Sequence, residues 1–392
     1  MLMRTHFLPL LLLGLWLTAA CTHRPPSYKQ VYTDVAYDNA CAKGFHIWGA
    51  RDRQSTVIEV TNPWQNARDV TMAYFVARGG EQPPEDFDGV VIPAGPRRIV
   101  CMSSSYVGML DALGATDRVV GVSGLDYINS PALLARRDSV RDVGAELDFE
   151  VLLGLKPDLV LLYGVDDAQT AVTDKLTELG IPYMYIGEYV EEDPIGRAEW
   201  MMVLAEVLGL QKRCQVMIDI LYTQYKTLSQ LVADVKERPK VMLNTPWNDI
   251  WTLPSPESYM ARLIHDAGGE YIFREGAAGS YTRIGMETAY SLLHEADYWL
   301  NISSVKTLDE LKAMDPQFAS AKAVREGHVF NNNLRTNAAG GNDFWESSVV
   351  KPSRVLLDLI CILHPEKRRA TDTLYYYRPI VPATGADTPP SR

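Results

Sequence analysis

The chain has 392 residues, 47% of them hydrophobic, and a formal net charge of −11 at pH 7. That length and apolar content are enough for two packed cores. Nucleic-acid binding needs a basic surface, so the acidic balance argues against a nucleic-acid partner. The net charge does not exclude a local basic pocket for a small ligand.

The first twenty residues have the pattern of a secretory signal. Arg4 is followed by the apolar run FLPLLLLGLWLTAA, of about 14 residues, whereas a bilayer-spanning helix needs about 20. Residues 17–21, LTAAC, resemble a lipobox, which implies that Cys21 is acylated and anchors the mature chain to a membrane. The alternative is ordinary signal-peptide cleavage near Ala20, which would leave Cys21 as an unmodified free thiol. We expect a lipid-anchored periplasmic protein of the cell envelope, with inner or outer membrane left open.

Residues 21–95 are expected to form a tether and a β-rich addition. A polar, proline-rich stretch at 22–30 precedes three segments of strand character, at 45–49, 55–60 and 70–76. About 70 residues with one thin apolar face would be marginal alone. We therefore expect this piece to pack on the following lobe as an antiparallel addition, with no role readable from its residues.

Two later parts of the chain, 96–190 and 239–366, repeat the same order of elements. Each has a strand, a polar loop, a helix and a second strand, then an acid that opens a helix before a further buried strand. Each then ends with a helix end, a glycine and a strand. The matching pairs are 97–105 with 240–246, 118–122 with 270–273, 148–164 with 285–303, and 178–188 with 324–333.

A long helix is predicted between the repeats, within the linking region 191–238. Residues 211–236 carry apolar positions at helical spacing and end before Pro239, which predicts a span of ~39 Å. A shorter helix at 194–208 leads into it, a helix at 349–364 closes the second repeat, and the tail 367–392 is expected to be disordered from 371 onward. The apolar positions are Val216, Ile220, Leu221, Leu228, Leu231 and Val235. The fold class is α/β, with two lobes, each a mostly parallel sheet flanked by helices, joined by one bridging helix.

Segments 99–127, 144–164 and 285–300, together with the middle helix, resemble periplasmic substrate-binding proteins of the helical-backbone type. These proteins serve ABC importers of iron(III) siderophores, haem and cobalamin. The resemblance covers roughly 97–364, and 147–161, LDFEVLLGLKPDLVL, is its most specific part. It implies a monomeric, non-enzymatic receptor that captures an iron(III) chelate, or alternatively haem or cobalamin, and delivers it to a permease and its ATPase.

Ligands of open α/β sheets bind outside the carboxyl ends of the strands, which selects six loops. They are 103–106, 124–131, 164–167, 245–251, 274–283 and 332–345. Aromatic area with a few guanidinium groups suits a large, partly anionic chelate or macrocycle. The alternative is that several of these aromatic residues belong to the lobe cores. The candidate ligand-binding residues are Tyr106, Tyr127, Tyr163, Trp247, Trp251, Tyr281, Arg283, Arg335 and Trp345.

Glu150 and Glu287 open helices at equivalent positions of the two repeats. Complementation of the helix dipole alone accounts for an acid at such a position, at about 0.3–1 kcal/mol. The resemblance implies a further role, because acids at these positions dock the family's binding proteins onto arginines of the permease.

Histidine, cysteine and catalytic patterns argue against other functions. No histidine falls in a cleft loop, so a bare zinc or manganese site is not expected, whereas haem with a tyrosine ligand stays open. No G-x-S-x-G, P-loop or H-E-x-x-H motif occurs, and a metallocluster enzyme would need cysteines clustered at the cleft. A scaffold without a ligand would leave the cleft aromatics unused. The four later cysteines, expected to be buried thiols although pairing is not deducible, are Cys41, Cys101, Cys214 and Cys361.

Overall fold

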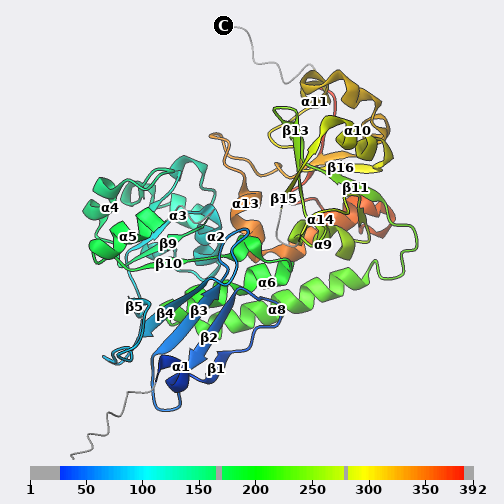
Figure 1. Cartoon of the computed structure of the whole chain (residues 1–392). Coiled ribbons are helices and arrows are strands. Elements are labelled where there is room, and N and C mark those ends of the chain that lie inside the picture. The colour runs from blue at the N-terminus through cyan, green and yellow to red at the C-terminus, as the bar shows by residue number, and fades with distance from the viewer. Residues whose placement is uncertain (1–26, 165–169, 278–280, 384–392) are drawn as a thin grey trace, which may run out of the picture.

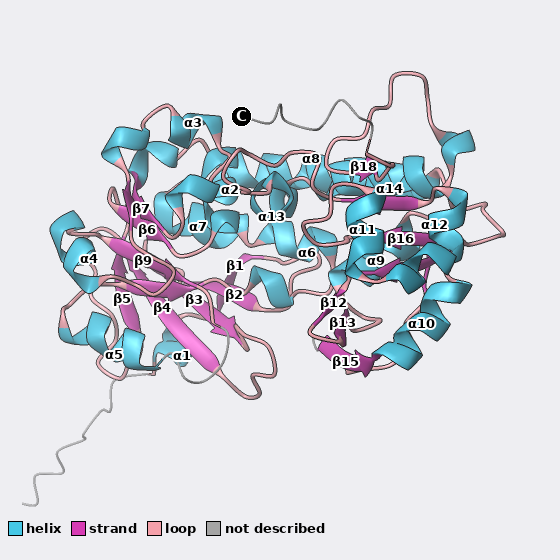
Figure 2. Cartoon of the chain, turned by 90° about the horizontal axis from the view of Figure 1, so that it is seen from above, coloured by secondary structure: helices cyan, strands magenta, loops and turns pink. Residues whose placement is uncertain are grey.

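The computed structural model describes residues 27–164, 170–277 and 281–383, and shows two α/β lobes joined by a long helix (Figure 1). The first lobe carries an additional β-sheet, which lies beside it in Figures 1 and 2. The predicted fold class is therefore confirmed. The signal peptide, Cys21 and residues 384–392 lie outside the described residues. Within those described, no helix combines the length and the apolar character that crossing a membrane requires.

The additional sheet has five strands in sequence order, antiparallel except for the parallel pair β4 and β5. One of its faces packs into the core of the first lobe, where Phe45, Ile58 and Tyr74 join Ile99 and Val203 in one apolar cluster. The strands are β1 (Asp34–Tyr37), β2 (Phe45–Gly49), β3 (Thr56–Thr61), β4 (Thr71–Ala77) and β5 (Val90–Pro93), preceded by helix α1 (Tyr28–Val31).

The first lobe is built on a parallel sheet with strand order β10-β9-β6-β7-β8. Strands β6, β7 and β9 are buried along their whole length, as apolar strands covered on both faces should be. The strands are β6 (Ile99–Cys101), β7 (Val119–Val122), β8 (Arg141–Asp142), β9 (Leu159–Leu162) and β10 (Tyr183–Tyr185). The helices are α2 (Ser104–Ala112), α3 (Pro131–Leu134), α4 (Phe149–Leu155) and α5 (Thr170–Glu178).

The second lobe repeats this topology, with strand order β14-β11-β16-β17-β18. Strands β11, β14, β16 and β17 occupy the places of β6, β7, β9 and β10, so the internal repeat predicted from the sequence is confirmed. Only β18 is antiparallel to its neighbour. The strands are β11 (Lys240–Leu243), β14 (Glu270–Tyr271), β16 (Tyr298–Leu300), β17 (Val329–Asn331) and β18 (Arg378–Pro379). The helices are α9 (Tyr259–Asp266), α10 (Met286–Glu295), α11 (Leu308–Met314), α12 (Lys322–Glu326) and α14 (Pro352–Leu363).

The bridging helix is α8 (Gln211–Gln230), preceded by α6 (Pro194–Glu199) and α7 (Met201–Leu208). Its 20 residues span ~30 Å, so the predicted end at 236 is wrong. After Gln230 the backbone tightens into turns, because the N–H groups of residues 231, 233 and 235 bond to carbonyls three residues back.

The buried stripe of α8 also differs from the one predicted. Val216, Ile220 and Leu231 are exposed by 57%, 52% and 43%. The helix buries Cys214, Ile218, Leu221 and Tyr225, which also recur at helical spacing, and of these only Leu221 was predicted. Helix α8 has two overlapping apolar patterns, and only packing against α7 and α14 decides between them.

The C-terminal segment is ordered as far as residue 383, so the predicted disorder from 371 onward is wrong there. Tyr376 and Tyr377 are fully buried. The buried carboxylate of Asp358 on α14 accepts hydrogen bonds from the backbone N–H groups of Tyr375, Tyr376 and Tyr377, at 2.9, 2.7 and 3.1 Å. This anchor brings the chain back to the sheet, where β18 pairs with β17.

The cysteines after Cys21 are all free thiols. Cys101 and Cys214 are fully buried, and burial raises the pKa of the Cys214 thiol to about 12. A thiol so protonated is a poor nucleophile, in agreement with a packing role.

The additional sheet is held to the linking helices by the buried carboxylate of Glu199. It accepts hydrogen bonds from the N–H groups of Ala40, Cys41 and Ala42, at 2.8, 2.7 and 2.6 Å, and from the hydroxyl of Tyr37 at 2.8 Å. These N–H groups belong to the turn between β1 and β2, which has no strand partner there.

Glu199→Ala is expected to lower the free energy of unfolding by ~3 kcal/mol or more, because it leaves several buried donors without an acceptor. Urea unfolding measures this, with Glu192→Ala as the matched control. The Glu192 carboxylate meets the ammonium of Lys43 near the surface, an ion pair worth ~1 kcal/mol or less. Equal stability of the two variants would contradict the anchoring role, and Glu199→Gln, which keeps one acceptor oxygen, should fall between them.

Candidate functional site

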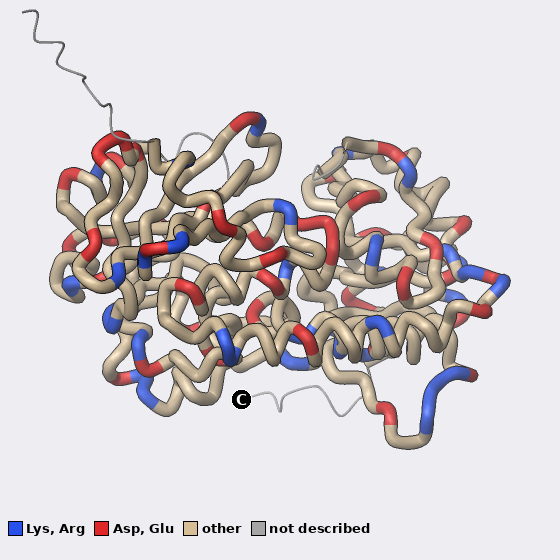
Figure 3. Tube along the Cα trace, turned by 90° about the horizontal axis from the view of Figure 1, so that it is seen from below, with Lys and Arg blue, Asp and Glu red and all other residues tan. Residues whose placement is uncertain are grey.

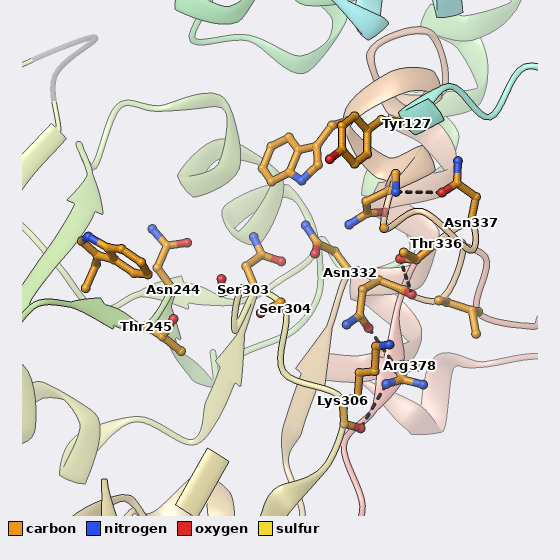
Figure 4. A pocket seen from close by; sticks show the side chains of 18 of the residues that line it. Tyr127, Asn244, Thr245, Ser303, Ser304, Lys306, Asn332, Thr336, Asn337 and Arg378 are labelled. Atoms are coloured by element: carbon orange, nitrogen blue, oxygen red, sulfur yellow. Dashed lines mark hydrogen bonds between the residues drawn. The ribbon is translucent and has the colours of Figure 1, made fainter. Parts of the chain in front are cut away.

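A cavity of about 990 Å³ opens between the lobes, and most of its wall comes from the second lobe (Figure 4). Part of the wall is a small antiparallel sheet of β12 (Pro246–Trp247), β13 (Ile250–Pro254) and β15 (Tyr281–Gly285). The first lobe contributes Ser104 and Tyr127. The other lining residues are Asn244, Thr245, Pro246, Trp247, Ile250, Thr252, Tyr281, Asn301, Ser303, Ser304, Lys306, Asn332, Asn333, Leu334, Thr336, Asn337, Ala338, Gly340, Gly341, Asn342, Trp345 and Arg378.

The floor of the cavity is the carboxyl edge of the second lobe's sheet. Asn244 follows β11, Asn301 follows β16, Asn332 follows β17, and Arg378 lies on β18, so four neighbouring strands each supply one polar residue. Asn244 and Asn301 have left-handed backbones, with φ of 65° and 59°. Asparagine tolerates this conformation better than most residues, which lets the chain turn sharply at the strand ends.

The structure brings together four of the predicted ligand-binding residues. Trp247, Tyr127, Trp345 and Tyr281 all line the cavity, and their exposed fractions are 80%, 58%, 55% and 54%. Four large aromatic side chains left this exposed within one cavity form an apolar surface that a ligand would cover.

Two other predicted ligand residues, Tyr106 and Trp251, are core residues, and their assignment to the cleft surface is wrong. Tyr106 is fully buried and donates its hydroxyl hydrogen to the carbonyls of Leu162 and Ile186. Trp251 is fully buried as well, and its indole N–H donates to the carbonyl of Leu243 at 2.8 Å.

The hairpin between β12 and β13 explains why two nearby tryptophans differ. Its two-residue turn, Asn248 and Asp249, has φ of 49° and 59°, the conformation that favours Asn and Asp in tight hairpins. Trp247 pairs with Ile250, whereas Trp251 pairs with Pro246, one position further along each strand. Successive residues of a strand point to opposite faces, so Trp247 faces the cavity and Trp251 faces the core.

The remaining three candidates lie outside the cavity lining. Tyr163 is half-buried between two apolar clusters of the first lobe. Arg283 is exposed on β15. Arg335 donates from Nε to the carboxylate of Asp343 at 2.6 Å, and its guanidinium lies 4.4 Å from the centre of the Tyr375 ring.

Sequence reasoning missed the polar floor and its two cations, Lys306 and Arg378. The asparagine- and serine-rich strand ends, 301–304 and 331–333, were the available signal, because they follow two buried strands of one sheet. Arg378 had no such signal, since it lies in the tail that was expected to be disordered.

The segment that follows β17 crosses from the second lobe to the first and fixes their relation. The buried carboxylate of Glu346 accepts the N–H groups of Asn129 and Ser130, at 2.6 and 2.7 Å. Asn337 donates from Nδ2 to the carbonyls of Asp126 and Ile128, both at 3.1 Å. Helix α13 (Asp343–Ser347), which carries Glu346, packs against α2 of the first lobe.

Glu150 and Glu287 are exposed in the first turns of α4 and α10, one on each lobe. Figure 2 places these two helices toward opposite ends of the molecule. Helix α4 leads into β9 and α10 into β16, which hold corresponding places in the two sheets, so the two positions are equivalent in topology.

The family of periplasmic binding proteins matches residues 99–332, which is more than half of the chain. The chain belongs to this family. Its members are binding components of transport systems and not enzymes. The match ends at β17, so the loop 333–345, α13 and Arg378 lie beyond it.

The chain is also similar to two curated relatives and, in fold, to one solved structure. An uncharacterised lipoprotein of Methanocaldococcus jannaschii is 26% identical over 72% of this chain and 68% of its own. An uncharacterised ABC transporter substrate-binding lipoprotein of Bacillus subtilis is 24% identical over 62% of this chain and 74% of its own. A periplasmic heme binding protein of Pseudomonas aeruginosa has a TM-score of 0.58 at 17% identity, over 74% of this chain and all of its own. By its family, the chain is a periplasmic binding protein.

Glu346 is expected to make stability depend on pH. Burial raises the pKa of its carboxyl group to about 7, so the folded protein holds a proton that the unfolded chain releases. The stabilising effect of that proton is complete below about pH 4.5 and is lost as the pH rises to about 7. Urea unfolding at about pH 5 and about pH 7 should show a smaller decline for Glu346→Gln than for the natural protein. Identical declines would contradict this assignment.

Proposed function

We propose that this binding protein captures an iron(III) chelate of the siderophore type in the cavity between its lobes and delivers it to an ABC permease. The observation that carries the proposal is the group of four exposed aromatic residues around a cavity of about 990 Å³. That volume is at the upper end of small-molecule sites, ~300–1,000 Å³, and suits a chelate larger than a bare ion.

The chemistry of the wall supports a chelated metal as cargo. Within the described residues, no group of three or more histidine, cysteine, aspartate or glutamate residues could hold a metal ion. The wall instead offers aromatic faces, hydroxyls and amides. Such groups contact the organic shell of a chelate, whose own donor atoms hold the iron.

Haem is the second candidate, and cobalamin a third ligand of the same class. Tyr127 and Tyr281 place phenol groups on the cavity wall, and a tyrosine oxygen is one of the protein ligands that haem iron accepts. The indoles of Trp247 and Trp345 would suit the flat face of either macrocycle.

Delivery requires a docking surface, for which Glu150 and Glu287 are the candidates. Figure 3 shows acidic and basic residues interspersed over the face seen from below, without a continuous basic stripe. Exposed acids at matched positions on two lobes fix the register of a partner and raise its rate of association. The lipoprotein relatives support attachment of the mature chain through lipid on Cys21, with the permease and its ATPase as partners.

Calorimetric titration of the mature protein with a ferric hydroxamate, a ferric catecholate, haem and cyanocobalamin tests the ligand. One of them should bind with one-to-one stoichiometry, and Trp247→Ala and Trp345→Ala should each weaken that binding ~10-fold through lost aromatic contact. Tyr222→Ala, which removes an exposed aromatic residue from α8, is the control and should change nothing. A folded protein that binds none of the four would contradict the proposal.

Glu150→Arg and Glu287→Arg test docking. Each should reduce ligand-stimulated ATP hydrolysis by the permease and ATPase in proteoliposomes by ~10-fold or more, because the substituted charge repels the arginines expected on the permease. Affinity for the ligand should stay unchanged. Glu237→Arg reverses an exposed charge after α8 and serves as the control. Full stimulation with both substitutions combined would rule out this surface.

A further inference from the structure

The cavity has a cationic end that the aromatic residues do not explain. Lys306 and Arg378 line it together, and none of its lining residues in the described part of the chain is an aspartate, glutamate or histidine. Figure 4 shows the two cations next to each other below Asn332. Two neighbouring cations that share a partly enclosed wall repel each other unless an anion joins them.

Arg378 is held in place without being neutralised. Its Nε donates to Oδ1 of Asn333 and one Nη2–H donates to the carbonyl of Lys306, both at 3.0 Å. Both acceptors are neutral amide oxygens, so the guanidinium keeps its charge and its other N–H groups have no recorded acceptor among the described residues. Pairing of β18 with β17 fixes the backbone from which it extends.

Lys306 is also positioned by its backbone alone. Its N–H donates to the carboxylate of Glu310 at 2.7 Å, and Glu310 is not part of the cavity wall. The loop that carries Lys306 is tied to β17 through Asn331, whose Nδ2 donates to the carbonyls of Ser303 and Val305, both at 2.9 Å. Within the part of the chain that the structure covers, the ammonium group has no recorded partner.

Asn332 supplies an independent observation. The residue is 4% exposed and lines the cavity, and its Nδ2 has no hydrogen-bond acceptor among the described residues. A buried donor without an acceptor costs roughly 1–3 kcal/mol, so its presence at the cavity wall indicates that a ligand supplies the acceptor.

We infer that Lys306, Asn332 and Arg378 form a subsite for anionic oxygens of the ligand, and that this subsite selects chelates of net negative charge. The inference rests on the proposed function and narrows its ligand class. The three residues line a cavity whose described wall contains no aspartate or glutamate, and an anionic oxygen accepts stronger hydrogen bonds than a neutral one. Arg378 lies beyond the segment that matches the family, so this part of the selectivity belongs to the chain's own C-terminal strand.

The test compares two iron(III) chelates of similar size and opposite charge by calorimetric titration of the mature protein. One is a hexadentate tris-catecholate complex, which is net negative, and the other is ferrioxamine B, which is net positive. The negative chelate should bind at least ~10-fold more tightly. Lys306→Gln and Arg378→Gln should each remove most of that preference and reduce the dependence of affinity on salt. Asn332→Asp should abolish binding of the negative chelate.

Lys312→Gln is the matched control, because Lys312 is an exposed lysine on α11 outside the cavity wall. Among the described residues, the Lys306 side chain makes no hydrogen bond, so Lys306→Gln is expected to fold. This variant still tests the subsite if Arg378→Gln fails to fold. If Arg378 had only a structural role, Arg378→Gln would weaken the binding of both chelates equally, and the preference for the negative chelate would remain.

The remaining outcomes separate the two proposals. If both chelates bind equally and the variants bind them as the natural protein does, the anion subsite is overturned. The proposed receptor function is unaffected by that result. Binding of inorganic phosphate that is lost in Arg378→Gln, without binding of either chelate, would support the subsite and overturn the iron chelate as cargo. No binding of chelates or phosphate to the folded protein would overturn both.

Discussion

The buried carboxylate of Glu346, which accepts the N–H groups of Asn129 and Ser130, is at the centre of the contact that holds the lobes in the relation that defines the cavity. Helix α8 fixes only how far apart the lobes stand, because a single rod leaves their mutual rotation free. The contact at Glu346 adds a second connection on the cavity side. A cleft fixed at two places has little freedom to close, since closure would have to leave buried donors unpaired or bend α8.

The internal repeat is symmetric where the partner is expected to dock and asymmetric where the ligand is expected to bind. Glu150 and Glu287 occupy equivalent turns on opposite lobes. The cavity wall, in contrast, comes almost entirely from the second lobe, through the β12-β13-β15 sheet and the loop 333–345. Helix α10, which carries Glu287, follows β15 directly and packs against β13 and β15. On the second lobe, the ligand surface and the expected docking position are therefore structurally linked.

Sequence reasoning predicted the lobes, their repeat and the helix starts at Glu150 and Glu287, because those features depend on local periodicity and order. It failed where two assignments fit one local pattern. Tyr106 and Tyr127 both follow first-lobe strands, and only the packing of α2 shows that Tyr106 faces inward. The Asn248-Asp249 sequence could have predicted a two-residue hairpin. Strand alternation on either side of that turn then places Trp247 and Trp251 on opposite faces. The place of Arg378 in the cavity could not be predicted from the sequence, because it depends on hydrogen bonds from backbone N–H groups to Asp358, which lies well before them in the chain.

The distribution of carboxylates links stability to selectivity. Glu199, Glu346 and Asp358 are buried, and each accepts backbone N–H groups of a segment that has no strand partner at that point. Five further acids are buried, Glu188, Glu191, Glu206, Asp343 and Asp372, and salt screens the exposed acids beyond ~8–10 Å. None of the described acids lines the cavity, which is left to amides, hydroxyls, aromatic rings and two cations. A chain with a net charge of −11 can therefore attract a negative ligand locally, because the nearest charges, and not the total, decide the potential inside a partly enclosed site.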